Sequence, residues 1–132
     1  RGQMLVLEKH IGLRRKIYDT YVEHLSAIPG VSFLKETTGV RSNRWLTTIT
    51  IDADKSNGVT REDIRLALEK DNIESRPLWK PMHLQPVFQH YPYYDNDRVS
   101  ERLFKDGLCL PSGSNMLMAD QKKVINIIKK NL

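Results

Sequence analysis

Residues 76–86, with the sequence RPLWKPMHLQP, constrain the fold of this chain more than any other segment. Each of the three prolines lacks an amide donor and favours an extended backbone at the residue before it, so no regular helix can run through the segment. The segment also carries Trp79, Lys80, Met82 and His83, large side chains that a flexible tether would not need. The pattern predicts a rigid, extended loop that either holds a ligand or fills the core with its tryptophan and methionine.

The length and composition indicate a single globular domain. A chain of 132 residues can bury about two-thirds of its unfolded surface without disulfides or metals. Its apolar runs are too short for a membrane span, and no signal peptide opens the sequence. Cys109 is the single cysteine, which excludes an internal disulfide and favours a cytoplasmic protein. The sequence starts at Arg1 inside an expected helix, so we interpret the chain as a piece of a longer protein.

The spacing of apolar residues predicts alternating helices and short strands. Apolar residues at three- and four-residue intervals indicate helices, and β-branched runs indicate strands. The expected helices cover residues 3–28, 61–71, 97–106 and 119–131. The expected strands cover residues 31–34, 45–51, 73–76 and 108–110. This order predicts an α+β fold, in which a long helix precedes a short, mostly antiparallel sheet of three or four strands with helices on one face.

The formal net charge of +5 raises an alternative, a freestanding basic α+β module that binds nucleic acid. Two observations argue against it. The aromatic residues gather in loops instead of alternating along a strand, and the basic residues are dispersed over several helices. Lys129 and Lys130 are explained by the dipole of the last helix, which favours cations at its C-terminus. We therefore expect neither nucleic acid nor a membrane as a partner.

The residues that usually carry catalysis do not assemble into a complete set. The four histidines lack metal-ligand spacing, and the sequence has no phosphate-binding glycine loop of a standard type. Ser112 and Ser114 lie in a PSGS turn and are expected to be turn residues. Cys109 lies between leucines in an expected strand, which is typical of a small buried side chain. We expect no metal site and no catalytic residue in this chain by itself.

Four motifs follow one another along the chain. They are GQMLVL at residues 2–7, SNRWLTT at 42–48, ESRPLWKPMHLQP at 74–86 and CLPSGSN at 109–115. This series resembles the C-terminal portion of the DegT/DnrJ/EryC1/StrS family, the pyridoxal-phosphate-dependent nucleotide-sugar aminotransferases. The amino-acid sequence of the motif at residues 76–86 is most similar to that of members that aminate UDP-linked 4-keto-6-deoxy sugars for bacterial glycans and exopolysaccharides.

The resemblance implies that residues 1–132 are the small C-terminal domain of a type I aminotransferase fold, and that the large cofactor-binding domain is absent from this chain. Family members are homodimers that take an amino group from glutamate. Their lysine that bonds pyridoxal phosphate lies in the large domain, upstream of the part matched here. We therefore expect pyridoxal phosphate in the full-length parent, no cofactor-binding residue in this chain, and no transamination by the chain alone.

The resemblance also implies a set of residues that face the substrate cleft. They are Arg44, Trp45, Arg76, Trp79, Lys80 and His83. The diphosphate of a UDP-sugar suits Lys80 or an arginine fork, and its rings suit the face of Trp79. His83 could donate a hydrogen bond to the sugar or to the diphosphate.

Arg44 or Arg76 could receive a carboxylate of glutamate. For Arg76 and Trp45, a salt bridge or a packing role remains as good an interpretation as ligand contact. A purely structural domain that supports a dimer is a further alternative, and the effect of His83→Ala on the full enzyme would distinguish it.

The last helix departs from the family pattern. Relatives commonly begin it with a serine or threonine before an aspartate, whereas residues 116–119 read MLMA before Asp120. The missing hydroxyl cap is expected to cost about 1 kcal/mol unless Asp120 or Ser114 replaces it.

Overall fold

The computed structural model describes residues 2–94 and 97–132, so Arg1 lies outside it. Four antiparallel strands form one sheet in the order β1-β2-β4-β3. The strands are β1 (Val31–Phe33), β2 (Thr47–Ile51), β3 (Arg76–Pro77) and β4 (Gly107–Leu110). The helices are α1 (Gly2–Leu25), α2 (Arg61–Lys70), α3 (Val99–Asp106) and α4 (Met118–Asn131), with short 3₁₀ turns at Met82–Leu84 and Pro86–Phe88. The predicted α+β class and the long first helix are confirmed.

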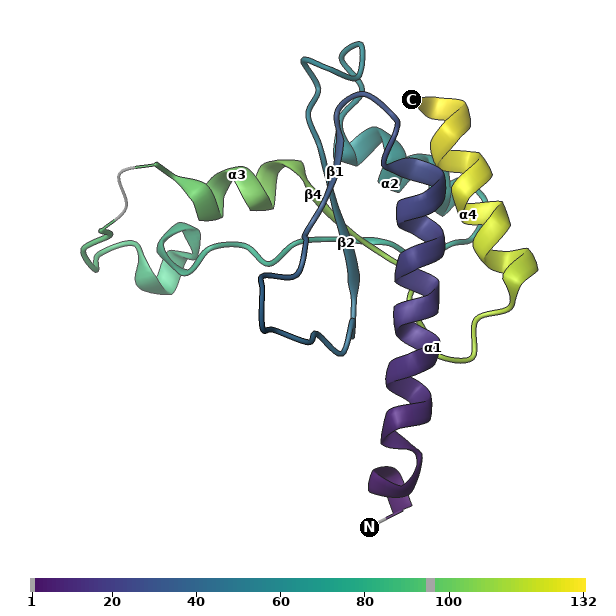
Figure 1. Cartoon of the computed structure of the whole chain (residues 1–132). Helices are drawn as coiled ribbons and strands as arrows, with labels where there is room; N and C mark the ends of the chain where they lie inside the picture. The colour runs from purple at the N-terminus through teal and green to yellow at the C-terminus, as the bar shows by residue number, and fades with distance from the viewer. Residues whose placement is uncertain (1, 95–96) are drawn as a thin grey trace.

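The core lies between the sheet and the helices α1, α2 and α4 (Figure 1). Strand β2 buries Thr47, Ile49 and Ile51 on this face, while the two residues between them are only partly covered. This alternation is the period of two that a half-buried strand requires. Strand β4, the other inner strand of the sheet, is buried along its whole length.

Helix α3 is an exception to the expectation that all helices lie on one face. It lies on the side of the sheet away from α1 and α4 (Figure 1). There Val99 and Leu103 line a hollow together with Ser32 and Thr50, the strand residues that point away from the core. The sequence did not indicate this placement, since the strand residues beneath α3 are polar.

Some elements are shorter than predicted, each for a local reason. Helix α1 ends at Leu25 instead of residue 28, because the ring of Pro29 excludes the carbonyl four residues before it. Strand β2 begins at Thr47 instead of residue 45, because its pairing with β4 starts at Thr47 opposite Leu110. Helix α3 begins after Arg98, whose φ of 50° also lies in the left-handed region.

The starts of α2 and α4 agree with the sequence. Thr60 and Asp63 form the predicted capping box at the start of α2, with each side chain accepting the other residue's amide hydrogen. At the start of α4 the N-cap is Leu117, which makes no side-chain capping bond. The hydroxyl of Ser114 is instead 2.7 Å from Nδ1 of His10. The missing cap is therefore confirmed.

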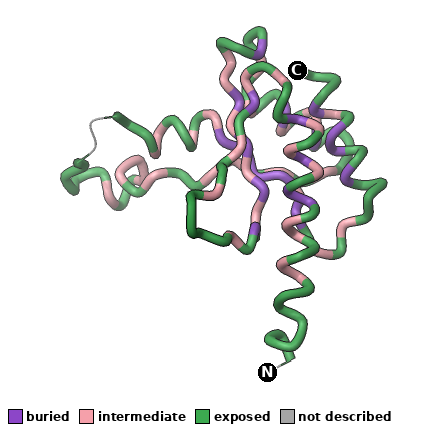
Figure 2. The backbone as a smooth tube through the Cα atoms, in the orientation of Figure 1, coloured by how far each residue is buried: buried purple, intermediate pink, exposed green. Residues whose placement is uncertain are grey.

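The first third of α1 extends away from the rest of the chain (Figure 2). The buried residues of α1 begin only at Ile17, whereas Leu7 is 43% exposed and Leu5 is 82% exposed. Nothing in residues 2–94 and 97–132 covers these apolar side chains. Even α1 is not apolar enough to cross a lipid bilayer, nor is any other helix of the described residues.

Gly107 lies at the junction of α3 and β4, where the structure leaves no room for the methyl group of an alanine. A β-carbon there would overlap the side chain of Leu78 and the carbonyl oxygen of Leu103, and a backbone atom cannot move aside cheaply. We expect Gly107→Ala to lower the free energy of unfolding by about 1–3 kcal/mol. Urea unfolding followed by circular dichroism measures this change.

The matched control is Gly12→Ala in α1, where a β-carbon meets nothing within 4 Å. Alanine is the better helix former, so this variant should be more stable by about 0.5–1 kcal/mol. Opposite signs for the two variants are the expected result, and an unchanged Gly107→Ala would contradict the close approach.

Candidate functional site

A groove of about 470 Å³ lies beside the outer strand β3, and two of the predicted residues form its aromatic wall. The rings of Trp45 and Trp79 are 6.5 Å apart between centroids and inclined by 38°. Trp45 is 59% exposed and Trp79 is 67% exposed, so both offer ring surface to a ligand. Arg76 lines the same groove, with Cys109 and Ser112.

The register of the sheet brings Arg76 and Trp79 to the groove. Arg76 pairs with Cys109 and Pro77 pairs with Leu108, and the amide of Leu78 then donates to the carbonyl of Gly107 over 3.2 Å. The backbone of residues 76–78 is thereby held extended along β4. Trp79 follows directly, at the point where the chain leaves the sheet.

The turn after β4 completes the groove. The hydroxyl of Ser112 donates to the carbonyl of Leu110 over 2.8 Å and accepts the amide of Thr47 over 2.9 Å. Ser112 is buried and ties β4 to the start of β2, which confirms its expected role as a turn residue. Cys109 is also buried as expected, and burial raises the pKa of its thiol.

Arg76 lines the groove and Lys80 follows Trp79 in the sequence, and these two cations differ in their partners. Nε of Arg76 donates to Glu74 over 2.7 Å, and the pair is largely exposed. An exposed pair of this kind contributes little to stability, so Arg76 can exchange Glu74 for an anionic ligand at small cost. Lys80 is exposed, and its ammonium forms no ion pair with any described residue.

His83 lies in a second hollow, away from the tryptophans. Its ring stacks on Tyr93 with centroids 3.5 Å apart, and Nε2 is 3.1 Å from Oε1 of Glu101. Met82 and Ser100 line the same hollow. The structure therefore does not bring His83 into the groove that holds Trp45 and Trp79.

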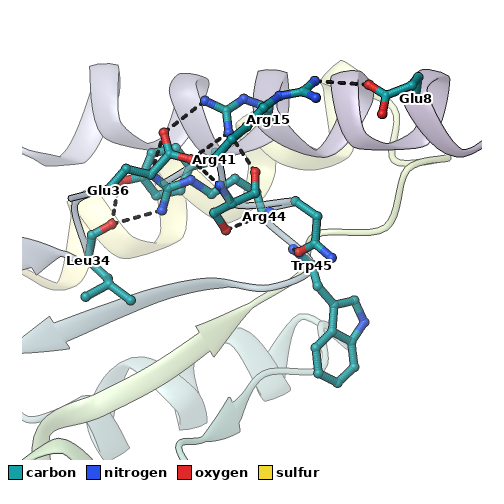
Figure 3. Close-up of polar contacts among 10 residues, drawn as sticks. Glu8, Arg15, Leu34, Glu36, Arg41, Arg44 and Trp45 are labelled. Carbon is teal, nitrogen blue, oxygen red and sulfur yellow. Dashed lines mark hydrogen bonds and ion pairs between the residues drawn. The ribbon is translucent and has the colours of Figure 1, made fainter. Parts of the chain in front are cut away.

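Arg44 is the predicted residue that the structure withdraws furthest from solvent. Its guanidinium lies 3.6 Å from the centre of the Tyr18 ring and donates to the carbonyl of Leu34 over 3.0 Å. It is also 3.6 Å from a carboxylate oxygen of Glu36 (Figure 3). The guanidinium is thus occupied by the protein, while the next residue, Trp45, points away from this charged cluster.

Glu36 and Arg15 complete the cluster, and the sequence analysis did not single out either of them. Arg15 donates to both carboxylate oxygens of Glu36, over 2.7 and 2.9 Å. The Arg15 guanidinium and the amide of Ser42 hold the pKa of Glu36 at about 2, well below its ordinary value of 4.5. No motif marks Glu36, because its partners are 6 and 21 residues away.

Comparison with solved structures identifies the fold. A DegT DnrJ EryC1 StrS aminotransferase from Brucella abortus superposes with a TM-score of 0.83 and 27% identity, over 98% of this chain and 33% of that one. DesV of S. venezuelae superposes with a TM-score of 0.86 and 19% identity, over 98% of this chain and 34% of that one. The α+β domain described above therefore has the fold of the matching part of these two proteins.

The sequence is similar to that of curated relatives. EpsN of Bacillus subtilis (strain 168), provisionally named a pyridoxal phosphate-dependent aminotransferase, is 45% identical over 130 residues, which cover 96% of this chain and 32% of EpsN. GDP-perosamine synthase of Vibrio cholerae is 30% identical over 97% of this chain and 34% of the synthase. The chain thus spans about a third of the length of these relatives.

A family model also matches residues 1–129 of the chain. The chain belongs to the DegT/DnrJ/EryC1/StrS aminotransferase family. The resemblance that the four sequence motifs indicated is therefore confirmed.

The lowered pKa of Glu36 predicts how the stability of the domain depends on pH. The folded protein keeps this carboxylate charged at pH values where the unfolded chain has begun to take up a proton. The stabilising contribution is therefore complete above about pH 4.5 and is lost as the pH falls towards 2. We expect the urea midpoint of the native protein to fall across this window, and that of Glu36→Gln to fall less.

Glu8→Gln is the control for this measurement. Glu8 forms an ion pair over 3.1 Å with Arg41, which lies like Glu36 in the loop between β1 and β2, but both side chains are largely exposed. The pH profile of this variant should follow that of the native protein. A Glu36→Gln profile that also follows it would contradict the prediction.

Proposed function

We propose that the chain is the small C-terminal domain of a pyridoxal-phosphate-dependent aminotransferase that transfers an amino group from glutamate to a nucleotide-linked keto-sugar. In this proposal the parent is a homodimer, its substrate is a UDP-linked 4-keto-6-deoxy sugar, and its product enters bacterial glycan or exopolysaccharide synthesis. The groove beside β3 is one wall of the substrate cleft, and the rest of the cleft comes from the remaining part of the parent.

The observation that carries the proposal is the wall of Trp45 and Trp79, flanked by Arg76. Two exposed ring faces 6.5 Å apart suit the flat surfaces of a nucleotide-sugar. Arg76 can bind a diphosphate or a carboxylate through two parallel hydrogen bonds, because its own partner Glu74 is exposed. Lys80 adds a second cation next to Trp79 in the sequence.

The groove does not fit the whole cofactor. Among the residues that line it in the described chain there is no lysine whose amine could bond an aldehyde. Arg76 could contact a phosphate, but covalent attachment has to come from another part of the parent. When bound there, pyridoxal phosphate supplies the carrier for the amino group. The residues of this chain would bind and orient the sugar against it.

The other interpretations receive less support. Membership of an aminotransferase family argues against a freestanding module for nucleic acid. His83, which the proposal also places at the cleft, stacks on Tyr93 and pairs with Glu101 at a separate hollow. In the proposal it contacts the substrate only if the nucleotide extends from the tryptophan wall to that hollow. The guanidinium of Arg44 is occupied by Tyr18, the Leu34 carbonyl and Glu36, so in the proposal Arg44 supports the loop and does not contact the substrate.

The chain alone is expected to retain no pyridoxal phosphate. After incubation with the cofactor and gel filtration, the protein fractions should carry no visible absorbance, because no lysine lines the groove. The full-length parent, treated identically, is the positive control. Absorbance that stays with the chain through the column would contradict this prediction.

The activity itself is tested on the full-length parent loaded with the cofactor. We expect glutamate to abolish the visible band of the bound cofactor, and a UDP-linked 4-keto-6-deoxy sugar to restore it. GDP- and TDP-linked analogues tested in parallel decide the nucleotide. A loss without recovery on any sugar would keep the aminotransferase and reject the substrate class, whereas a parent without a band would overturn the proposal.

Paired variants of Trp79 test its ring face. Trp79→Ala in the parent is expected to raise KM for the nucleotide-sugar about tenfold, because stacking on an aromatic side chain is worth about 1–3 kcal/mol. Trp79→Phe keeps a ring face and should recover most of the loss. KM for glutamate serves as the internal control. Equal KM values for Trp79→Ala and the native enzyme would favour a purely structural domain.

A further inference from the structure

We propose that Glu36, held by Arg15, positions Trp45 against Trp79 and so fixes the aromatic wall of the groove. Glu36 touches no ligand in this proposal, so it is a positioning residue. The inference rests on the proposed function only where it says that the wall contacts the sugar nucleotide. The geometric part of it concerns this chain alone.

Trp45 has little of its own to keep it in place. The residue is 59% exposed, and its ring neighbour is Trp79, which is exposed to a greater extent. A contact between two exposed rings is too weak to offset the conformational entropy of ordering a loop by itself. The position of Trp45 therefore depends on its backbone.

The backbone before Trp45 belongs to residues 34–46, which leave β1 and return to β2. Glu36 lies on the outgoing part and Ser42 on the returning part. One carboxylate oxygen of Glu36 accepts the amide of Ser42 over 2.5 Å and a guanidinium hydrogen of Arg15 over 2.7 Å. Arg15 also donates to the carbonyl of Ser42 over 2.6 Å. The two residues thus join both parts of the loop to helix α1 (Figure 3).

Hydrogen bonds within residues 42–45 connect the contacts of Glu36 and Arg15 to the indole of Trp45. The amide of Arg44 donates to the hydroxyl of Ser42 over 3.1 Å, and the amide of Trp45 donates to the side chain of Asn43 over 3.0 Å. Arg44 adopts a φ of 48°, a conformation that a non-glycine residue keeps only when its surroundings impose it. This left-handed residue turns the chain so that the Arg44 side chain enters the protein while Trp45 faces the groove.

The charges explain why Glu36 is needed. The Arg44 side chain is only 9% exposed, and Glu36 is the carboxylate that the structure places beside both Arg44 and Arg15. Without Glu36, two guanidinium groups would share this site with the ring of Tyr18 and backbone carbonyls. A buried cation that has lost its counter-charge is strongly destabilised, so Arg44 should leave the site and Trp45 should move with it.

The experiment uses the fact that the chain contains two tryptophans, Trp45 and Trp79. Indoles this close couple excitonically and give a couplet in circular dichroism, and Trp79→Phe defines the spectrum without it. We expect Glu36→Gln to abolish the couplet while the helical signal is kept. Arg15→Lys keeps the charge but loses the paired hydrogen bonds to both carboxylate oxygens of Glu36, so it should reduce the couplet in part.

Glu8→Gln is the matched control, since it removes a carboxylate that pairs with the same loop through Arg41 at the surface. Its couplet should equal that of the native chain. An unchanged couplet in folded Glu36→Gln would overturn the proposal. If Glu36→Gln does not fold, Arg15→Lys decides in the same way.

Kinetics of the full-length parent separate this inference from the proposed function. We expect Glu36→Gln to raise KM for the nucleotide-sugar about tenfold, with little change in kcat, since the chemistry takes place elsewhere. A lost couplet with an unchanged KM would support the positioning of Trp45 and contradict its contact with the sugar. A raised KM with an intact couplet would show that Glu36 acts by another route and overturn the inference.

Discussion

The close approach of β3 to β4 at Gly107 is the constraint on which the groove depends. β3 is only two residues long, and it is held by its pairing with Leu108 and Cys109 and by the bond from the amide of Leu78 to Gly107. A side chain at position 107 would occupy the space that Leu78 fills. Because Pro77 cannot donate a ladder hydrogen bond, an edge position is the place in a sheet where this sequence can lie. β3 is therefore an edge strand of the sheet, and Trp79 lies just beyond its C-terminal end, beside the groove.

The two tryptophans are positioned by different kinds of interaction. Trp79 follows a strand whose place is determined by backbone pairing and by the buried residues of β4. Trp45 ends a loop that has no regular structure, and its place is determined by the ion cluster around Glu36. Backbone pairing between uncharged peptide groups is insensitive to salt and pH, whereas a cluster of charges at the edge of the core responds to both. In the wall of the groove, the position of Trp79 is thus independent of charge, whereas the position of Trp45 depends on the charge of the Glu36 cluster.

The local features of this fold could be predicted from the sequence, whereas the contacts between residues that are distant in the sequence could not. The capping box at Thr60, the uncapped start of α4 and the β-branched run of β2 are set by neighbours along the chain, and periodicity or a short motif reveals them. The burial of Arg44 is different, because it depends on Tyr18 and Glu36, which are 26 and 8 residues away. An arginine in a polar turn has the same pattern whether it faces a ligand or the core.

The arrangement of charges around Trp45 also bears on affinity. A flexible indole would have to be ordered when a ligand binds, and immobilising a side chain and its loop costs about 0.5–1.5 kcal/mol for each rotamer-rich group. The Glu36 cluster makes that ordering part of folding instead, so the contact with a ring can be realised in full. The cluster is built from two arginines that are unavailable for phosphate. Arg76, which lines the groove, and Lys80, which follows Trp79 in the sequence, remain for the anion. Holding the ring and binding the anion are in this way assigned to separate groups of residues.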